Sequence, residues 1–191
     1  TVQTPGRAVT YSGDTQIDGV AGRAAAIPLE FQDTAGSMCG DLLPTGNIVD
    51  HINDVECTLI DNGMPCIILR ASDVGITGYE NREKLDDNEQ MKLQIEAIRL
   101  KAGFLMNLGD VSKKSVPKIM MVALPQFDGA ISVRSFIPHH AHASIGVLGA
   151  VTVATACLIP GSVASKMANT PDGKRKIISI EHPTGEISCE L

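Results

Sequence analysis

A long uncharged stretch near the end of the chain constrains the fold most. No Asp, Glu, Lys or Arg occurs between His142 and Lys166, and the stretch reads as a helix from about Ser144 to about Leu158. A helix that is apolar on all sides must be buried, either in a protein core or in a membrane. This one is short, carries Ser, Gly and Thr, and lacks the aromatic and basic residues that anchor a helix at a membrane surface. We therefore expect a helix buried in a protein core and no membrane partner.

Small side chains on this helix indicate how it is covered. Gly146, Gly149, Ala150 and Ala154 would let a strand approach the helix axis closely. Strands are predicted both before and after the helix, so the pattern favours layers of sheet and helix that share one core. We expect an α+β fold in which a curled mixed β-sheet wraps around the buried central helix.

The remaining elements follow from hydrophobic periodicity and turn residues. A second helix, from about Asp87 to about Met106, is amphipathic and should pack on one side of the sheet. Asp61-Asn62-Gly63 is a turn signal between two strands. Strands are expected at 8–11, 25–31, 55–60, 66–69, 119–124, 130–136, 177–180 and 186–191.

Charge and length exclude some classes of protein. The net charge of −6 argues against a nucleic-acid partner, because phosphate binding needs clustered Lys and Arg. The basic clusters Lys113–Lys114 and Lys174–Lys176 lie beside turn residues, and we interpret them as solvated loop charges. The 191 residues suffice for a single domain, which would bury about 70% of the surface of the unfolded chain.

The cysteines indicate the cellular compartment, and the two ends of the chain indicate whether it is a whole protein. Five cysteines form no CxxC pair and leave one unpaired in any full disulfide scheme, which is typical of a reducing compartment and predicts a cytoplasmic protein. The first residues carry neither an initiator Met nor the apolar segment of a signal peptide. The last residues alternate like a strand and then stop. We therefore expect a fragment or an isolated domain.

The segment Arg134–Gly146 is the strongest local signal for chemistry. A strand ends, a His-rich loop follows, and the buried helix begins. The first turn of a helix has unpaired N–H groups and a partial positive charge, so it binds anions readily. Alternatively, Ser144 is only an N-cap and the histidines are ordinary loop residues.

The histidines of this loop also raise the question of a metal. His139 and His142 stand three residues apart, but no Cys or acidic residue follows at a metal-ligand spacing, so we predict no metal site. A histidine beside a carboxylate site is better suited to proton transfer. The loops 42–47 and 61–65 offer backbone donors and amides, or serve only as turns.

Several of these stretches, in the same order over nearly the whole chain, resemble the second half of PrpF-like isomerases. Within that family, Asp-Asn-Gly-Met-Pro, Arg-Ser-Phe-Ile-Pro-His and His-Ala-Ser-Ile-Gly are most similar to the members that act on 4-oxalomesaconate. The stretches that carry the resemblance are 13–20, 42–47, 60–65, 76–80, 96–100, 106–112 and 134–156.

The resemblance implies a diaminopimelate-epimerase-like fold with two similar domains and the active site in the cleft between them. Residues 1–191 would be the second, C-terminal domain, and the first domain would be absent. In the related epimerase a catalytic Cys stands at the start of the central helix, where this sequence has Ser144. The family's proton-transfer residues, a Lys and a Cys in an Asn-Cys-Gly-Asn motif, belong to the first domain. The catalytic base therefore stays unassigned here.

The implied activity is that of an isomerase or tautomerase. It would move a C=C bond in an unsaturated di- or tricarboxylate similar to 4-oxalomesaconate, by proton transfer without a cofactor or metal. The alternative is a non-catalytic carboxylate-binding or assembly domain of the same fold. Expected partners are the carboxylate, the missing first domain and, through an exposed apolar face, further copies of the chain. The candidate substrate-binding residues are Ser144, Ile145, Gly146, His142, Arg134, Thr45, Asn47, Asn62 and Met64.

Overall fold

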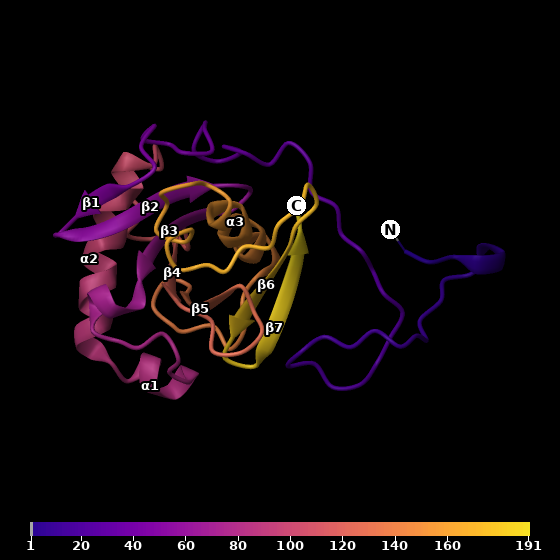
Figure 1. Ribbon diagram of the computed structural model, residues 1–191. Coiled ribbons are helices and arrows are strands. Elements are labelled where there is room, and N and C mark those ends of the chain that lie inside the picture. Colours follow the sequence, from indigo (N-terminus) through magenta and orange to yellow (C-terminus); the bar gives the residue numbers. More distant parts are fainter. Residues whose placement is uncertain (1) are drawn as a thin grey trace. The chain divides into compact units, whose positions relative to one another are not determined.

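The computed structural model describes residues 2–191 and divides into two compact units, Thr1–Asp33 and Thr34–Leu191 (Figure 1). The first unit holds a short 3-10 helix, Pro5–Arg7, and an isolated bridge between Thr15 and Ala24. The strands predicted at 8–11 and 25–31 are wrong, because a single backbone bond joins the two stretches, from the Ala25 N–H to the Tyr11 carbonyl at 2.9 Å, and no ladder of bonds follows it. That all 191 residues form one domain stays a prediction.

A seven-stranded mixed sheet organises the second unit, and its strands follow one another across the sheet in sequence order. The pairs β3–β4 and β5–β6 are parallel and the others are antiparallel. The strands are β1 (Asp50–Ile52), β2 (Val55–Asp61), β3 (Pro65–Arg70), β4 (Lys118–Ala123), β5 (Ile131–Phe136), β6 (Ile177–His182) and β7 (Gly185–Glu190).

The sheet confirms the predicted α+β class and six of the expected strands. It is open, with β1 at one edge and β7 at the other, and it is not strongly curled. Wrapping of the sheet around the helix is therefore not confirmed. Strand β1 and the helix α1 (Arg82–Asp86) were not predicted, because three and five residues are too short to show a period.

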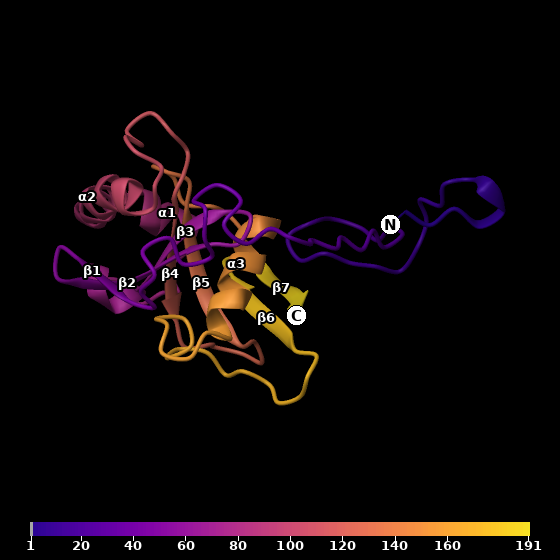
Figure 2. The same cartoon turned by 90° about the horizontal axis from the view of Figure 1, so that it is seen from above.

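The two longer helices lie on opposite faces of the sheet (Figure 2). Helix α2 (Glu89–Leu105) covers the face that carries Leu59, Ile67, Ile119 and Met121, which we call the α2 face. Alternate residues of the same strands, Ile60, Cys66, Ile68 and Met120, point to the other side. Helix α3 (Val147–Cys157) covers this α3 face. The strict alternation explains why one strand serves two cores.

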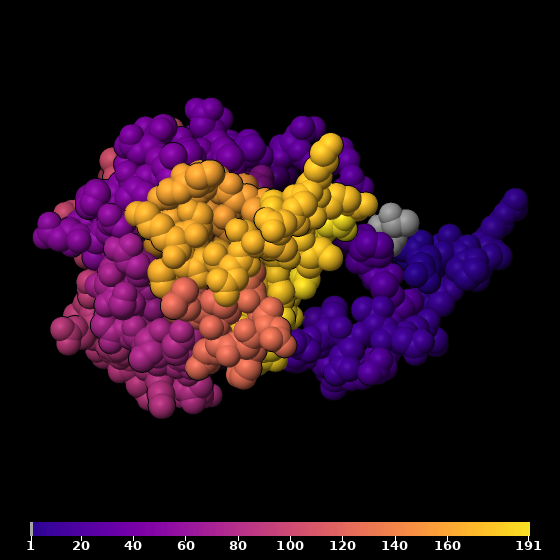
Figure 3. Space-filling view, in the orientation of Figure 1, coloured from indigo at the N-terminus to yellow at the C-terminus, as the bar shows by residue number. Residues whose placement is uncertain are grey.

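Helix α3 is largely buried, as its apolar sequence predicts, and contacts β2, β3, β6 and β7. Gly149 lies against β4, since an added Cβ would come within 2.8 Å of the Met120 methyl carbon and that side chain would have to shift. The segment that follows the helix, in orange and yellow, covers the centre of one face of this unit (Figure 3). Among residues 2–191 no helix is both long and apolar enough to cross a membrane.

The helix begins three residues later than predicted. Its N-cap is Gly146, in an extended conformation, and the first intrahelical bond runs from the Ala150 N–H to the Gly146 carbonyl over 2.8 Å. The His142 ring accepts the Ser144 N–H at 3.0 Å, which holds this part of the chain in a loop. Val147, in the first turn, is 43% exposed. The first turn of α3 therefore reaches the surface.

A buried arginine fixes the approach to β4. The Arg99 guanidinium is fully buried and donates to both carboxylate oxygens of Glu96, at 2.6 and 2.8 Å. Its Nη1 also lies 3.0–3.3 Å from the carbonyl oxygens of Val111, Lys114 and Val116. These bonds shape the loop that delivers the chain into β4.

Candidate functional site

The first turn of α3 has N–H groups without partners. Gly146 has no side chain to cap the helix, and no other side chain of residues 2–191 caps it. The N–H groups of Val147, Leu148 and Gly149 precede the first intrahelical donor, Ala150. Unpaired N–H groups and the helix dipole give this end a partial positive charge.

Ser144 is held by two histidine rings. Its N–H donates to His142 Nδ1 at 3.0 Å, and its Oγ lies 3.3 Å from His182 Nε2. His182 Nδ1 in turn accepts the Thr184 N–H at 3.3 Å. A backbone N–H can only donate, so we assign both neutral rings a proton on Nε2. His182 then donates to Ser144 Oγ, and the hydroxyl proton of Ser144 is free to point toward a ligand.

Lys118 places a positive charge near the start of α3. It is the first residue of β4, and its Nζ lies 3.7 Å from the point where a Cβ of Gly146 would stand. The side chain is half-buried. No acceptor or acidic group among residues 2–191 bonds to its ammonium, whereas the helix end that it faces is also positive. The pair therefore attracts an anion.

Ser135 adds an unused hydroxyl. It is 2% exposed, and its Oγ has no hydrogen-bond partner among residues 2–191. The register pairs Ser135 with Met120, whose methyl carbon lies against Gly149 in the first turn of α3. The Ser135 side chain therefore lies on the α3 face of the sheet. We call Lys118, Ser135, His142, Ser144, Gly146 and His182 the α3 N-terminal site.

Two of the predicted residues, Ile145 and Gly146, join this site with backbone N–H groups that no described acceptor occupies. The Ser144 N–H is already bonded to His142, so its hydroxyl is the donor left over. His142 contributes its ring as the acceptor of that bond. The structure thus brings together four of the nine candidates.

Arg134 lies on the other face of the sheet. It pairs with Met121 on the α2 face, and its Nε donates to the Glu80 carbonyl at 2.7 Å. Its Nη1 donates to the carbonyl of Val133 at 3.0 Å. Burial lowers the pKa of Arg134 from its usual value, and the nearby Glu80 carboxylate opposes that shift. The side chain therefore supports the loop at Glu80 and does not meet Ser144.

Asn62 and Met64 attach the β2–β3 turn to the middle of α3. The Asn62 side chain donates to Thr155 Oγ1 at 2.8 Å, and the carbonyls of both residues lie 3.2 Å from Thr152 Oγ1. These bonds give both residues a role in packing the turn.

Thr45 and Asn47 bond to a single carboxylate. Thr45 Oγ1 and Asn47 Nδ2 donate to the two oxygens of Asp50, at 2.7 and 2.8 Å. No described bond joins either residue to α3. The turn interpretation of this loop accounts for both.

The remaining histidines of the loop lie near acids. His139 Nδ1 is 3.9 Å from Glu96, and His140 Nδ1 is 4.0 Å from Asp86. Within residues 2–191 no three His, Cys, Asp or Glu side chains gather in a way that could hold a metal ion.

The five cysteines are free and buried. Burial raises the pKa of Cys39, Cys57, Cys66 and Cys157 to about 12, and that of Cys189 to about 11. Since a thiolate is the reactive form, none of these thiols is a nucleophile near neutral pH.

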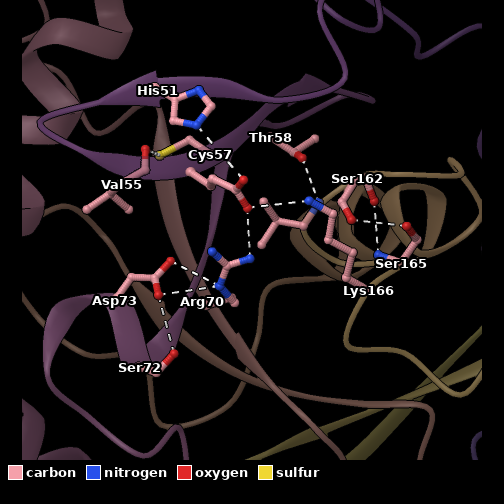
Figure 4. A network of polar contacts seen from close by, with 12 residues as sticks. His51, Val55, Cys57, Thr58, Arg70, Ser72, Asp73, Ser162, Ser165 and Lys166 are labelled. Carbon is pink, nitrogen blue, oxygen red and sulfur yellow. Dashed lines mark hydrogen bonds and ion pairs between the residues drawn. The ribbon is translucent and has the colours of Figure 1, made fainter.

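A second polar network links Glu56 to Arg70, Lys166 and His51, and Figure 4 shows it from close by. Glu56 accepts from Arg70 at 2.9 Å and from Lys166 at 3.4 Å, and these bonds lower the pKa of Glu56. Thr58 Oγ1 accepts the Val163 N–H at 3.0 Å. The network ties the segment after α3 to β2 and β3, so its role is structural.

An open cavity of about 600 Å³ lies where β5 and β6 begin, away from the helix start. Asp128 is the charged residue in its lining, which includes Phe127, Pro171 and Ile177. A negative charge among apolar groups is unsuited to binding a carboxylate.

Sequence reasoning missed Lys118, Ser135 and His182. Lys118 follows Pro117 at the start of a strand, and Ser135 stands next to Arg134 in the segment already singled out. His182 precedes the Pro183–Gly185 turn of the last hairpin. Strand alternation alone would have placed Ser135 opposite Arg134, but nothing local pairs these positions with the helix start.

Comparisons with known proteins agree on one family. The model of the PrpF family, described as PrpF protein, matches residues 1–191. The chain is 66% identical over its full length to the (4E)-oxalomesaconate Delta-isomerase of a Novosphingobium species, covering 54% of that protein. It is 54% identical to the 4-oxalomesaconate tautomerase of Pseudomonas putida, again over its full length and 53% of the relative.

A solved structure agrees as well. The crystal structure of methylitaconate-delta-isomerase superposes with a TM-score of 0.87 at 28% identity, over 98% of this chain and 54% of the other. The chain spans about half the length of the curated relatives it matches.

Proposed function

Because the chain belongs to the PrpF family, we propose that it is part of an isomerase or tautomerase that moves a C=C bond in an unsaturated di- or tricarboxylate similar to 4-oxalomesaconate. The observation that carries this proposal is the uncapped first turn of α3 with the Lys118 ammonium beside it. A site with only donors and positive charge suits a carboxylate.

We assign the chain the role of the second domain of a two-domain protein. The coverage of the relatives, about half their length, supports this assignment. The domain would have a diaminopimelate-epimerase-like fold, with the start of α3 facing a cleft that the first domain completes. Cytoplasmic location and assembly into homo-oligomers remain predictions.

In the proposed reaction a proton α to a carboxylate or carbonyl is removed and returned elsewhere, through an enolate-like intermediate. Negative charge then develops on oxygen. The N–H groups of Gly146 and Val147 and the Ser144 hydroxyl would stabilise it, since they are fixed in place before the reaction. The proton-transfer groups would come from the first domain, and the chemistry needs no cofactor.

The other candidates serve this proposal in different ways. His142 positions Ser144 through its ring. Asn62 and Met64 would shape the wall of the site through their bonds to α3, and Thr45 and Asn47 would lie farther along the cleft. The bonds of Arg134 favour a supporting role for that residue, away from the substrate.

An assay separates this proposal from its alternative. The 191-residue chain and a version with the first domain are each supplied with 4-oxalomesaconate and 2-methylaconitate, and the shift in conjugated double-bond absorbance is followed. We expect turnover only when the first domain is present. Turnover by the 191-residue chain alone would show that it holds the base. A longer version that binds these acids but converts none would instead favour a non-catalytic carboxylate-binding or assembly domain.

A further inference from the structure

The solvent side of α2 carries a row of apolar residues, Leu93, Ala97, Leu100 and Phe104, which we call the α2 stripe. Their spacings of four, three and four residues place the side chains along one line of the helix. The same spacing brings two helices together in a coiled coil. Met91 and the other side chains that α2 packs against the sheet lie on the opposite side of the helix.

The α2 stripe is open to solvent although its residues are apolar. Leu93 is 73% exposed and Phe104 is 66% exposed, Ala97 is exposed as well, and Leu100 is half-buried. Figure 2 shows α2 nearly end-on at the outside of the second unit. A surface helix usually presents charged residues on the side away from the core, and scattered apolar residues there are ordinary. An unbroken apolar row over about three turns instead marks an interaction surface.

A second copy of the chain fits this surface better than the first domain does. The proposed cleft with the first domain lies at the start of α3, whereas α2 covers the other face of the sheet. A domain that closes the cleft therefore leaves the α2 stripe uncovered. In a two-fold dimer each stripe meets an identical stripe, so the spacing of the apolar residues is matched by symmetry.

The polar residues beside the stripe indicate how the two copies are oriented. Glu89 and Glu96 lie along one edge of the stripe, and Gln94 and Lys101 lie along the other. In a parallel pair of helices the two unlike edges meet, which places Glu96 opposite Lys101 and Glu89 opposite Gln94. In an antiparallel pair the two acidic edges would meet and repel each other.

Both members of the expected ion pair can accommodate a further partner. Glu96 accepts hydrogen bonds from the buried Arg99, and its side chain is 26% exposed. Lys101 donates to the Asn53 side chain. An ammonium has three donors and a carboxylate about four acceptor positions, so each group can also bond across an interface. Their bonds within the chain hold both groups in place, which lowers the entropy lost on association.

We propose that the α2 stripe is the contact between two copies of the chain, with the α2 helices parallel about a two-fold axis and Glu96 of each copy opposite Lys101 of the other. This inference goes beyond the proposed function, which involves the α3 face alone. One pair of helices buries less than the roughly 1,200–2,000 Å² of a stable interface, so the dissociation constant should be on the order of micromolar.

Sedimentation velocity of the 191-residue chain and of the version with the first domain measures the association. Phe104→Lys places a charge in the stripe and should raise the dissociation constant about tenfold or more. Phe127→Lys is the matched control, because Phe127 is 77% exposed and lies outside the stripe, and it should leave association unchanged. Lys101→Glu should raise the dissociation constant about threefold or more, since it then faces Glu96. Melting curves show that each variant is folded.

Cross-linking tests the orientation of the two helices. In a parallel pair each position faces itself, so Ala97→Cys and Phe104→Cys should both give disulfide-linked dimers with oxidised glutathione. Asp172→Cys, on an exposed loop before β6, is the control for chance collisions and should link more slowly. The five native thiols are buried and do not interfere. Linkage of Ala97→Cys without Phe104→Cys would overturn the parallel arrangement.

A longer version that stays monomeric at millimolar concentration would overturn the proposal, as would equal loss of association in Phe104→Lys and Phe127→Lys. The same holds if the thiol of Ala97→Cys in the longer version is protected from maleimide at every protein concentration, because the first domain then covers the stripe. The isomerase assay reads the other face of the sheet. Turnover by a monomeric protein would therefore reject this inference and keep the proposed function.

Discussion

Two buried serines of β5, on opposite faces of the sheet, differ in their hydrogen bonding. Ser132 and Ser135 are both buried, at 1% and 2% exposure, three residues apart on opposite faces. On the α2 face, Ser132 Oγ donates to the Gly78 carbonyl and lies 3.4 Å from Arg134 Nη1. On the α3 face, Ser135 Oγ has no partner in residues 2–191.

The positively charged side chains Arg99, Arg134 and Lys118 differ between the two faces in the same way as the serines. Arg99 and Arg134, on the α2 side, donate hydrogen bonds to carbonyl oxygens and to Glu96. The ammonium of Lys118, on the α3 side, donates no hydrogen bond to a described residue. Polar groups that are fully bonded maintain the fold, whereas groups with donors left over are available to a ligand. Among these residues Ser135 and Lys118 keep unbonded donors, although Asp61 Oδ1, at the end of β2 on the α2 face, is also buried without a partner in residues 2–191.

The largest effect should come from Arg99. Arg99→Met removes both bonds to Glu96 and leaves the carbonyls of the loop before β4 without a donor, so the free energy of unfolding should fall by about 3 kcal/mol. Urea unfolding measures it. Arg82→Met, which breaks the exposed pair with Asp86, should cost about 0.5 kcal/mol or less and serves as the control. Equal losses in the two variants would contradict the structural role of Arg99.

The two serines give opposite expectations. Ser132→Ala should lower the free energy of unfolding by about 1 kcal/mol, because it leaves the Gly78 carbonyl unpaired. Ser135→Ala removes an unpaired hydroxyl and should leave stability equal or slightly higher, while it weakens carboxylate binding. Thermal melts and calorimetry on the two alanine variants check both parts. If both variants lose the same stability, the distinction between the faces is wrong.

The loop beneath Arg134 should show a pH dependence. Glu80 accepts from the N–H groups of Thr77 and Gly78 at 2.7 and 3.0 Å. Burial alone would raise the pKa of Glu80, but these bonds outweigh it, so the pKa lies below its ordinary value. A lowered pKa in the fold means that the stabilisation is present above the unfolded pKa of about 4.3 and is lost as the pH falls through the folded pKa.

Glu80→Gln should accordingly cost about 1 kcal/mol at pH 7 and progressively less below pH of about 4. Urea unfolding of parent and variant across this range gives the difference at each pH. A difference that stays constant down to pH of about 3 would show that the charge of Glu80 has no part in it.

The smallest effect belongs to the loop of Thr45 and Asn47, which the sequence leaves open between a site and a turn and whose bonds to Asp50 fit a turn. Thr45→Ala removes one bond to Asp50 from a partly exposed loop and should change stability by about 0.5 kcal/mol. Affinity for trans-aconitate should stay the same if the carboxylate sits only at α3. A clear loss of affinity would extend the site to Thr45 and weaken the division by faces.

Much of the fold could be predicted from the sequence, because the apolar and alternating stretches are long enough to show a period. The uncharged stretch after His142 gave the buried helix, and the amphipathic stretch around Ile95 gave α2. The strands expected in the first 33 residues failed, since apolar residues such as Val9 and Ile27 remain exposed and one backbone bond, from Ala25 to Tyr11, joins the two stretches. An alternating sequence shows that a segment could form a strand, but it does not show whether another strand lies beside it to pair with.

The site was predicted only where its residues are local. Ser144 and Gly146 could be predicted because they directly precede the helix in the sequence. Lys118 and His182 lie on distant strands, and only the pairing of those strands in the sheet brings them to the helix start. Arg134 was wrongly predicted to lie at the site. It is next to Ser135 in the sequence, but neighbouring side chains of a strand point to opposite faces of the sheet. The unused donors could not be recognised from the sequence, because it does not show which bonds are already made.

The buried thiols offer a way to observe each face separately. Cys39 and Cys57 belong to the core under α2, and Cys66, Cys157 and Cys189 to the core under α3. With their pKa values at about 11–12, these thiols react with an alkylating agent only after the surrounding structure opens. The rate of alkylation at each cysteine, read by peptide mass, therefore reports the opening free energy of its own half of the protein. A bound carboxylate should slow the labelling of Cys66 and Cys157 more than that of Cys57.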